Sequence, residues 1–321
     1  MPRSLLPRLG VLFAPDPVSG LDLSNLARRA ARAEALGLHR AAVSDHLVYH
    51  VPTFDPVVCL AAMATATSTI RLASGVLILP LRHPVQVAQS FASLDVLSSG
   101  RIDLGVGVGG EWPGEYAALG LDPHVRGQRA DEALAVIRAL WDGEEVSFAG
   151  RHFRLDGVRL GLRPAQPGHP PIVVGGRSEA ALRRAARFGD RWDGIFFDPV
   201  GYSRRVRRLA ELAGEAGREV GTGLVVWGCI GPRAEARARM AATLERFYQL
   251  PFERFARSAL WGDLDDWSDR LGELAEAGAF DVTVIPVGDL DEQLEALGAL
   301  AALGTASPAA GSRMAAPAGN L

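Results

Sequence analysis

The sequence contains no lysine, so all 34 of its basic residues are arginine. A chain without lysine has no Schiff-base nucleophile and no Walker-type phosphate-binding lysine. Cysteine is almost as scarce: Cys59 and Cys229 stand alone, without the spacing of a metal or redox motif. These absences exclude several classes of enzyme and fit a protein of the reducing cytoplasm.

Long apolar runs and an excess of one charge are also missing. No window approaches the length needed to cross a membrane, and proline and arginine interrupt residues 1–8, which argues against a secretory signal. The net charge of -3 provides no basic stripe for nucleic acid. We therefore expect a cytoplasmic protein that acts on a small molecule, without a nucleic-acid or membrane partner.

Short apolar runs alternate with longer amphipathic segments about eight times along the 321 residues, which is typical of repeated βα units. Eight such units predict an α/β fold, a (β/α)8 TIM barrel, although an open doubly wound sheet shows the same alternation. The expected strands are Gly10–Ala14, Arg40–Ser44, Leu72–Leu79, Ile102–Val108, Ile172–Val174, Gly194–Phe197, Gly223–Cys229 and Val282–Val287.

Two segments depart from the simple repeat. Residues 145–163 have hairpin character around Ala149-Gly150, so we expect an inserted hairpin between units four and five. The stretch Pro232–Phe280 is too long for one helix and is expected to break at Trp261-Gly262. Past Leu303 the chain turns to Ala, Gly, Ser and Pro. We expect one barrel domain over residues 1–303 and a flexible tail over 304–321.

Glycines at two strand exits are the most informative local feature. Gly75 interrupts the apolar run Leu72–Leu79, and Ile102–Val108 runs into alternating glycines that include Gly107 and Gly109. Ligands of parallel sheets bind at the carboxyl ends of the strands, where such glycines would admit a planar ring. Simple relief of crowding in a tight strand is the alternative.

A dinucleotide fingerprint is a further interpretation of the same glycines, because Gly105, Gly107 and Gly110 have its spacing. That motif requires an immediate helix and then a strand with an acidic end. Neither follows here, so we set this interpretation aside.

Gly175-Gly176-Arg177-Ser178 follows a predicted strand and opens a predicted helix. Free amides, the positive helix end and the Arg177 guanidinium together favour an anion such as a phosphate. The alternative is an ordinary turn in which Ser178 caps the helix.

Asp45 and His46 end the second predicted strand, at the rim where barrel enzymes place catalytic groups. Histidine exchanges protons near neutral pH, and the adjacent carboxylate could hold it in one tautomer. The alternative is a hydrogen-bonded packing histidine. His46 and His50 have a spacing used for metals, but no third ligand is evident, so no metal is expected.

Acidic and aromatic residues follow the fourth predicted strand. Glu111, Trp112 and Glu115 would reach the substrate from this rim loop, and we choose Glu111 as the candidate. The alternative is a solvated helix start, where acids are favoured by the helix dipole.

Eight motifs, taken together and in order, resemble the bacterial luciferase-like flavin and deazaflavin oxidoreductases, in particular their coenzyme F420-dependent branch. Each is weak alone, but they span roughly residues 9 to 290. The motifs are Val43–Leu47, Ala73–Val76, Pro80–Pro84, Asp95–Arg101, Gly105–Gly109, Glu115–Tyr116, Pro171–Gly176 and Phe188–Gly194.

The resemblance implies the eight-unit barrel and a hydride transfer between F420 and a small imine, enone, carbonyl or alcohol. It implies that His46 is the active-site histidine and that Gly107 and Gly109 line the cofactor. The cofactor phosphate is expected at Gly175–Ser178. The ring is expected to rest on a bulge at Ser74, Gly75 and Val76 that contains a cis Gly75–Val76 peptide bond.

Two other activities occur in the resembling family. One is an FMNH2-dependent monooxygenase supplied by a partner flavin reductase, in which FMN replaces F420. The other is a flavin-binding protein without turnover, against which the intact Asp45-His46 pair argues. A homodimer is expected by analogy.

Overall fold

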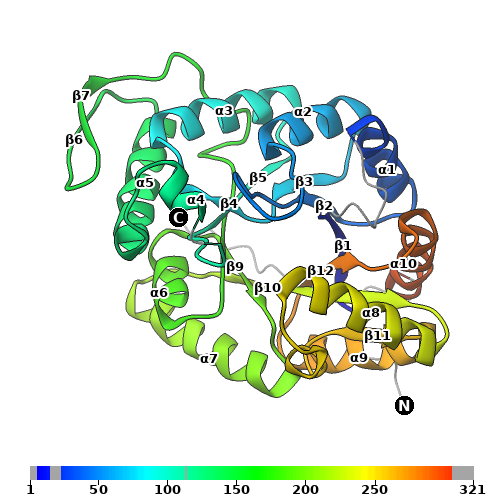
Figure 1. The fold of residues 1–321 in the computed structure, drawn as a ribbon. Helices are drawn as coiled ribbons and strands as arrows, with labels where there is room; N and C mark the ends of the chain where they lie inside the picture. The colour runs from blue at the N-terminus through cyan, green and yellow to red at the C-terminus, as the bar shows by residue number, and fades with distance from the viewer. Residues whose placement is uncertain (1–5, 15–22, 113, 306–321) are drawn as a thin grey trace, which may run out of the picture.

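The computed structural model describes residues 6–14, 23–112 and 114–305, and its centre is a closed barrel of eight parallel strands (Figure 1). Hydrogen bonds join each strand to the next and join β12 back to β1. This closure decides between the two predicted architectures in favour of the TIM barrel. The eight strands are β1 (Arg8–Phe13), β2 (Arg40–Val43), β3 (Arg71–Ser74), β5 (Ile102–Gly107), β8 (Ile172–Gly175), β9 (Arg191–Ile195), β10 (Gly221–Ile230) and β12 (Asp281–Pro286).

Eight helices form the outer ring, each packed against its neighbours, with the last against the first. Their apolar faces cover the outward-facing residues of the strands, for example Val11, Leu72 and Leu104, in one large core. The ring consists of α1 (Leu23–Ala35), α2 (Pro56–Ala66), α3 (Pro84–Leu97), α5 (Arg126–Trp141), α6 (Glu179–Phe188), α7 (Pro199–Glu215), α9 (Leu264–Glu276) and α10 (Leu290–Thr305).

The predicted hairpin is confirmed as β6 (Val146–Ala149) paired with β7 (Arg154–Val158), between units four and five. It projects from the barrel beside α5 (Figure 1). The carboxylate of Glu132 on α5 holds it by accepting the amides of Arg151, His152 and Phe153.

A second insertion follows the seventh barrel strand. It contains α8 (Arg233–Tyr248), the short helix η3 (Phe252–Arg254) and the strand β11 (Leu260–Gly262), which extends the sheet beside β10. More than one helix was predicted here, but the expected break at Trp261-Gly262 is part of a strand. Three residues are too few to show a strand period in the sequence.

Other boundaries differ by a few residues. The predicted strand Leu72–Leu79 is divided at Gly75 into β3 and β4 (Leu77–Ile78), followed by the short helix η1 (Leu79–Leu81). The peptide bond Gly75–Val76 is cis, as the resemblance implies. At the far end α10 continues to Thr305, two residues into the expected tail, and the rest of that tail lies outside the described residues.

Charged side chains fill the barrel interior at the amino ends of the strands. Asp103 accepts hydrogen bonds from Arg40, at 2.8 Å, and from Arg71, while Arg191 binds Asp193 and Asp281 at 2.7 and 2.9 Å. Because the side chains of Asp103 and Arg40 are only 2% and 4% exposed, this network closes the lower end of the barrel.

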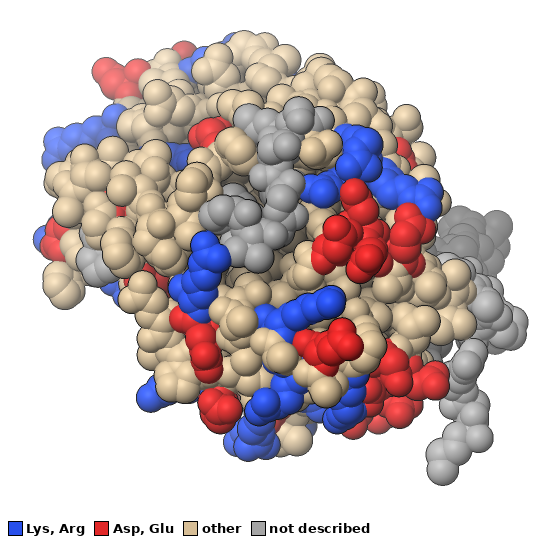
Figure 2. All heavy atoms as spheres, turned by 45° about the vertical axis from the view of Figure 1, so that its right-hand side comes forward, with Lys and Arg blue, Asp and Glu red and all other residues tan. Residues whose placement is uncertain are grey.

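On the molecular surface, acidic and basic side chains are mixed. Figure 2 shows acidic and basic side chains next to one another on the side that carries α1 and α10. Arg28 and Arg32 of α1 form ion pairs with Asp291 and Glu295 of α10. Within the described ranges, none of the helices combines the length and the apolar character that a membrane crossing would need.

Candidate active site

Small residues are frequent in four neighbouring strands of the barrel, near its rim. Alanine or glycine occupies successive positions there, at Ala42, Ala73, Gly105, Gly107 and Gly175. Two of them, Ala42 and Ala73, share one buried apolar cluster with the larger Leu12, Trp227 and Ile285. The space left by the small residues lies at the carboxyl ends of the strands, where barrel enzymes bind their ligands.

Val76 occupies part of that space. A Cβ atom at Gly107 would lie 2.5 Å from Val76 Cγ2, and one at Gly175 would lie 2.7 Å from Val76 Cγ1. At Gly109, where φ is +57°, a Cβ would lie 2.8 Å from Ile78 Cγ2. Side-chain atoms of Val76 and Ile78 therefore leave no room for a Cβ at these three positions. This supports the alternative interpretation, in which the glycines relieve crowding between strands. The half-buried Val76 side chain lies over Gly107 and Gly175 and presents an apolar surface at the rim, which we call the apolar floor.

Ser74 and Gly75 support this bulge from the barrel wall. The buried Ser74 hydroxyl donates to the Gly105 carbonyl at 2.7 Å. Gly75 packs against Leu12 and Ala42, and a Cβ there would lie 2.7 Å from Leu12 Cδ1. The predicted cofactor contact of Ser74 therefore does not involve a free hydroxyl, because that group joins β3 to β5.

The predicted anion site has the local geometry of both of its interpretations. Ser178 caps α6 by accepting the Ala181 amide at 3.2 Å, so the capping role is real. The amides of residues 177–180 nevertheless have no recorded acceptor among the described residues. Gly176 adopts φ +127°, and a Cβ there would lie 3.1 Å from Ala181 Cβ.

Arg177 adds a cation at this turn. Its exposed guanidinium lies 5.9 Å from the centre of the Phe196 ring and has no ion-pair partner recorded in the described part of the chain. Several free amides, a helix start and an unpaired guanidinium form a donor set that suits a phosphate. The residues present therefore fit the charged end of the cofactor that the resemblance implies.

His46 and Asp45 leave the second strand in different directions. Asp45 is buried, and its carboxylate accepts two hydrogen bonds from Arg82, at 2.5 and 2.9 Å, and one from the Ile78 amide at 2.8 Å. The prediction that Asp45 orients the His46 ring is therefore wrong. Adjacent residues of an extended segment point to opposite sides, so closeness in sequence did not bring the two groups together.

Glu115 is the carboxylate that meets His46. It lies on the short helix α4 (Gly114–Ala118), is fully buried, and places Oε1 3.2 Å from His46 Nδ1. One face of the imidazole ring stacks on the Tyr49 ring, with 4.0 Å between ring centres. The predicted candidate in the same loop is Glu111, but its side chain is exposed, whereas that of Glu115 is buried. A role for Glu111 stays a prediction.

A row of aromatic rings, called the aromatic wall below, extends from His46 across the carboxyl end of the barrel, which we call the mouth. Tyr49 contacts Trp112 and Phe247, with 6.0 and 5.5 Å between ring centres, and Phe247 contacts Trp227. Burial raises the pKa of Tyr49, and Glu111 and Glu115 raise it further. The Tyr49 phenol therefore stays protonated near neutral pH and does not compete with His46 for proton exchange.

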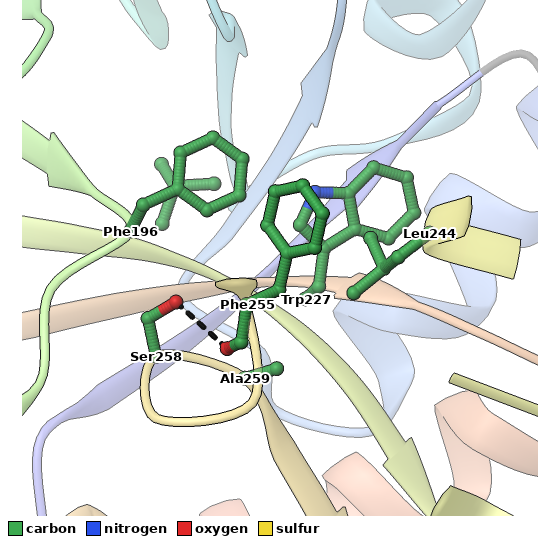
Figure 3. Close-up of a pocket in the computed structure, with 7 residues that line it drawn as sticks. Phe196, Trp227, Leu244, Phe255, Ser258 and Ala259 are labelled. Carbon is green, nitrogen blue, oxygen red and sulfur yellow. Dashed lines mark hydrogen bonds between the residues drawn. The ribbon is translucent and has the colours of Figure 1, made fainter. Parts of the chain in front are cut away.

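The inner end of this aromatic wall borders a small apolar pocket. Figure 3 shows Phe196, Trp227, Leu244 and Phe255 around it, with the Ser258 hydroxyl donating to the Phe255 carbonyl at 2.9 Å. Leu244 of α8 and three residues that follow η3, namely Phe255, Ser258 and Ala259, supply part of the lining, so the second insertion contributes to this pocket. Among the described residues no group of three His, Cys, Asp or Glu side chains could hold a metal ion.

Proteins of known activity are similar to this chain in sequence. The F420-dependent hydroxymycolic acid dehydrogenase of Mycobacterium tuberculosis is 36% identical over 248 residues, which cover 71% of this chain and 65% of that protein. The F420-dependent glucose-6-phosphate dehydrogenase of Nakamurella multipartita is 37% identical over 177 residues, covering 52% and 50%. The matches thus span one half to two thirds of these curated relatives.

Solved structures confirm the fold. An F420-dependent secondary alcohol dehydrogenase in complex with an F420-acetone adduct superposes with a TM-score of 0.82 at 21% identity, covering 92% of this chain and 98% of that one. The monooxygenase RslO1 from Streptomyces bottropensis has the same TM-score and coverage at 23% identity. The sequence profile of the luciferase-like monooxygenases matches residues 9–307. The chain belongs to the luciferase-like monooxygenase family.

Proposed function

We propose that this protein is an oxidoreductase that transfers a hydride between coenzyme F420 and a small organic substrate. One observation carries the proposal: the same barrel rim has a turn with free backbone amides, the apolar Val76 and a histidine held by a buried carboxylate. The F420-dependent dehydrogenases among the relatives support the choice of cofactor.

Each part of the rim has a separate task. The amides that follow Gly176 and the Arg177 guanidinium would hold the cofactor phosphate. Val76, seated over Gly107 and Gly175, would support the ring, with Gly109 and Ile78 behind it. When bound, F420 supplies the hydride donor or acceptor, which no side chain can provide.

His46 manages the proton. For an alcohol, its Nε2 accepts the hydroxyl proton as the substrate is oxidised. For a carbonyl or imine, the same nitrogen donates a proton to the oxygen or nitrogen. The aromatic wall of Tyr49, Trp112 and Phe247 excludes water from this exchange and favours a substrate with an apolar body.

The rest of the proposal follows the resemblance. We infer a cytoplasmic homodimer that uses a small-molecule substrate. The alternative activity is an FMNH2-dependent monooxygenase that receives its flavin from a partner reductase. Monooxygenases of the same fold support this alternative, and they share the fold at low identity.

A turnover assay separates the two activities. The purified protein is given oxidised F420 with a panel of alcohols, and reduced F420 with enones, imines and carbonyls. In parallel it receives reduced FMN with oxygen. We expect F420 turnover with at least one substrate class and no substrate-dependent oxygen uptake with FMN. Oxygenation with FMN alone would overturn the proposal.

A further inference from the structure

We propose that Glu115 is the positioning residue of His46, which it holds in the Nδ1–H tautomer so that Nε2 is the nitrogen that exchanges protons with substrate. The catalytic consequence rests on the proposed function above, whereas the tautomer itself does not. No tautomer was assigned from the sequence, where Asp45 was expected to take this part.

The hydrogen bonds of Glu115 fix the direction of donation. Oε1 accepts the Leu47 amide at 2.8 Å, which makes this oxygen an acceptor. The same oxygen lies 3.2 Å from His46 Nδ1, so the bond between them is best made by an Nδ1–H group. A histidine that donates through Nδ1 has its lone pair on Nε2.

Glu115 is itself fixed to the barrel. Its amide donates to the Trp112 carbonyl at 3.3 Å, and the hydroxyl of its neighbour Tyr116 donates to the Val108 carbonyl at 2.6 Å. Tyr116 is fully buried against Ile78 and Leu81. The short helix α4 is therefore anchored to the end of β5, and the carboxylate cannot move independently of the rim.

The second carboxylate oxygen shows why packing does not explain this residue. Glu115 Oε2 is buried and has no hydrogen-bond partner among the described residues. Leaving a buried polar atom unpaired costs about 1–3 kcal/mol. If Glu115 only filled space, an apolar side chain of similar size would therefore make the protein more stable. The bonds that Oε1 makes to the His46 loop are what the carboxylate contributes here.

The other charged and titratable groups near His46 have different partners. Arg82 binds Asp45, and the Tyr49 ring contacts both the His46 and the His50 rings. Glu111 acts on Tyr49, whose pKa is raised first by burial and then by this carboxylate. Thr53 ties the loop by donating to the His46 carbonyl at 2.6 Å. In the described structure Glu115 is thus the recorded partner of Nδ1.

The tautomer can be measured without cofactor. We would record the nitrogen chemical shifts of histidine-labelled protein, assign His46 with His46→Ala, and compare the wild type with Glu115→Leu. We expect the Nδ1–H tautomer in the wild type and a shift toward Nε2–H, the form that free imidazole side chains favour, in the variant. The same tautomer in both proteins would overturn the proposal.

Turnover gives a second, independent test through a double-mutant cycle. Glu115→Leu should lower kcat by at least about 10-fold, but by less than the roughly 100- to 10,000-fold expected for loss of His46. Cofactor affinity should stay within a few-fold. In a His46→Ala background the same change should have almost no effect, because Glu115 acts through His46. If the fold-losses in kcat of the two single variants multiply in the double variant, the proposal is contradicted.

Two further variants keep the result interpretable. Glu115→Gln retains an acceptor for the Leu47 amide, so it serves if Glu115→Leu does not fold, and it should lose less activity. Glu34→Gln is the matched control, since Glu34 also accepts backbone amides, those of Ser68 and Ile70, but lies at the opposite end of the barrel. It should change neither the tautomer nor turnover. If the protein shows no turnover with F420 but the tautomer changes in Glu115→Leu as expected, only the proposed function is contradicted, and the role of Glu115 stands.

Discussion

His46 is restrained on two sides in the described structure. The carboxylate of Glu115 holds one ring nitrogen, and the ring of Tyr49 covers one face. A proton-exchanging group that is already oriented loses little entropy when the substrate binds. At the scale of single residues, the proposed proton exchange therefore depends on one imidazole and its support.

Replacing His46 by Ala should lower turnover by about 100- to 10,000-fold, the usual loss when a general acid or base is removed. Cofactor affinity should remain within a few-fold, because the anion site and the ring floor lie on other loops. Steady-state kinetics and a binding titration on the same preparation measure both quantities. Unchanged turnover would remove His46 from the mechanism.

The sequence was informative where function depends on one position and its local neighbours. His46, the turn Gly175–Ser178 and the bulge at Gly75 were all placed at strand ends, as the structure has them. The partner of His46 was not predictable, because Glu115 is 69 positions away and meets the imidazole only after β2 and β5 take their places in the barrel. Chain neighbours such as Asp45 are a poor guide to side-chain contacts in extended segments.

At the scale of elements, the break between β3 and β4 determines the shape of the rim. Val76 leaves the strand there and lies over Gly107 of β5 and Gly175 of β8. The glycines and the valine are therefore one steric unit made from three strands. The sequence showed the glycines but not the side chain that requires them, because that contact is between strands.

The steric unit predicts a compensating pair of substitutions. Gly107→Ala should destabilise the protein by about 1–3 kcal/mol, because its Cβ would overlap Val76 Cγ2. Val76→Ala removes the overlapping atom, so the double variant should recover most of that loss. Denaturant unfolding of the four proteins measures the coupling. Additive losses would show that Val76 is not what the glycine accommodates.

At the scale of the whole molecule, the barrel divides its tasks between its two ends. The mouth carries small residues, aromatic rings and His46, while the opposite end is closed by Arg40, Arg71 and Asp103 in a buried network. Charges buried in this way are stabilising only as complete pairs. The eight-unit barrel was predictable from alternating apolar runs, whereas this network was not, because its members come from several separate strands.

Asp103→Asn should test that division. The substitution removes the carboxylate that Arg40 and Arg71 share and leaves Arg40 with only the more distant Asp281, at 3.9 Å. Removing one member of a buried ion pair costs about 3–5 kcal/mol. The free energy of unfolding should fall by that amount while cofactor affinity at the mouth is unchanged. An affinity that falls in proportion to stability would show that the two ends are coupled.

We propose above all that the mouth holds a deazaflavin whose phosphate lies at the turn after β8. The most direct measurement is an equilibrium titration of the purified protein with F420 and with FMN, each oxidised and reduced, repeated with Gly176→Val. The account predicts tighter binding of F420 than of FMN, and a marked loss in the variant, since Gly176 adopts φ +127° beside Ala181. Submicromolar binding of FMN with negligible binding of F420 would contradict it.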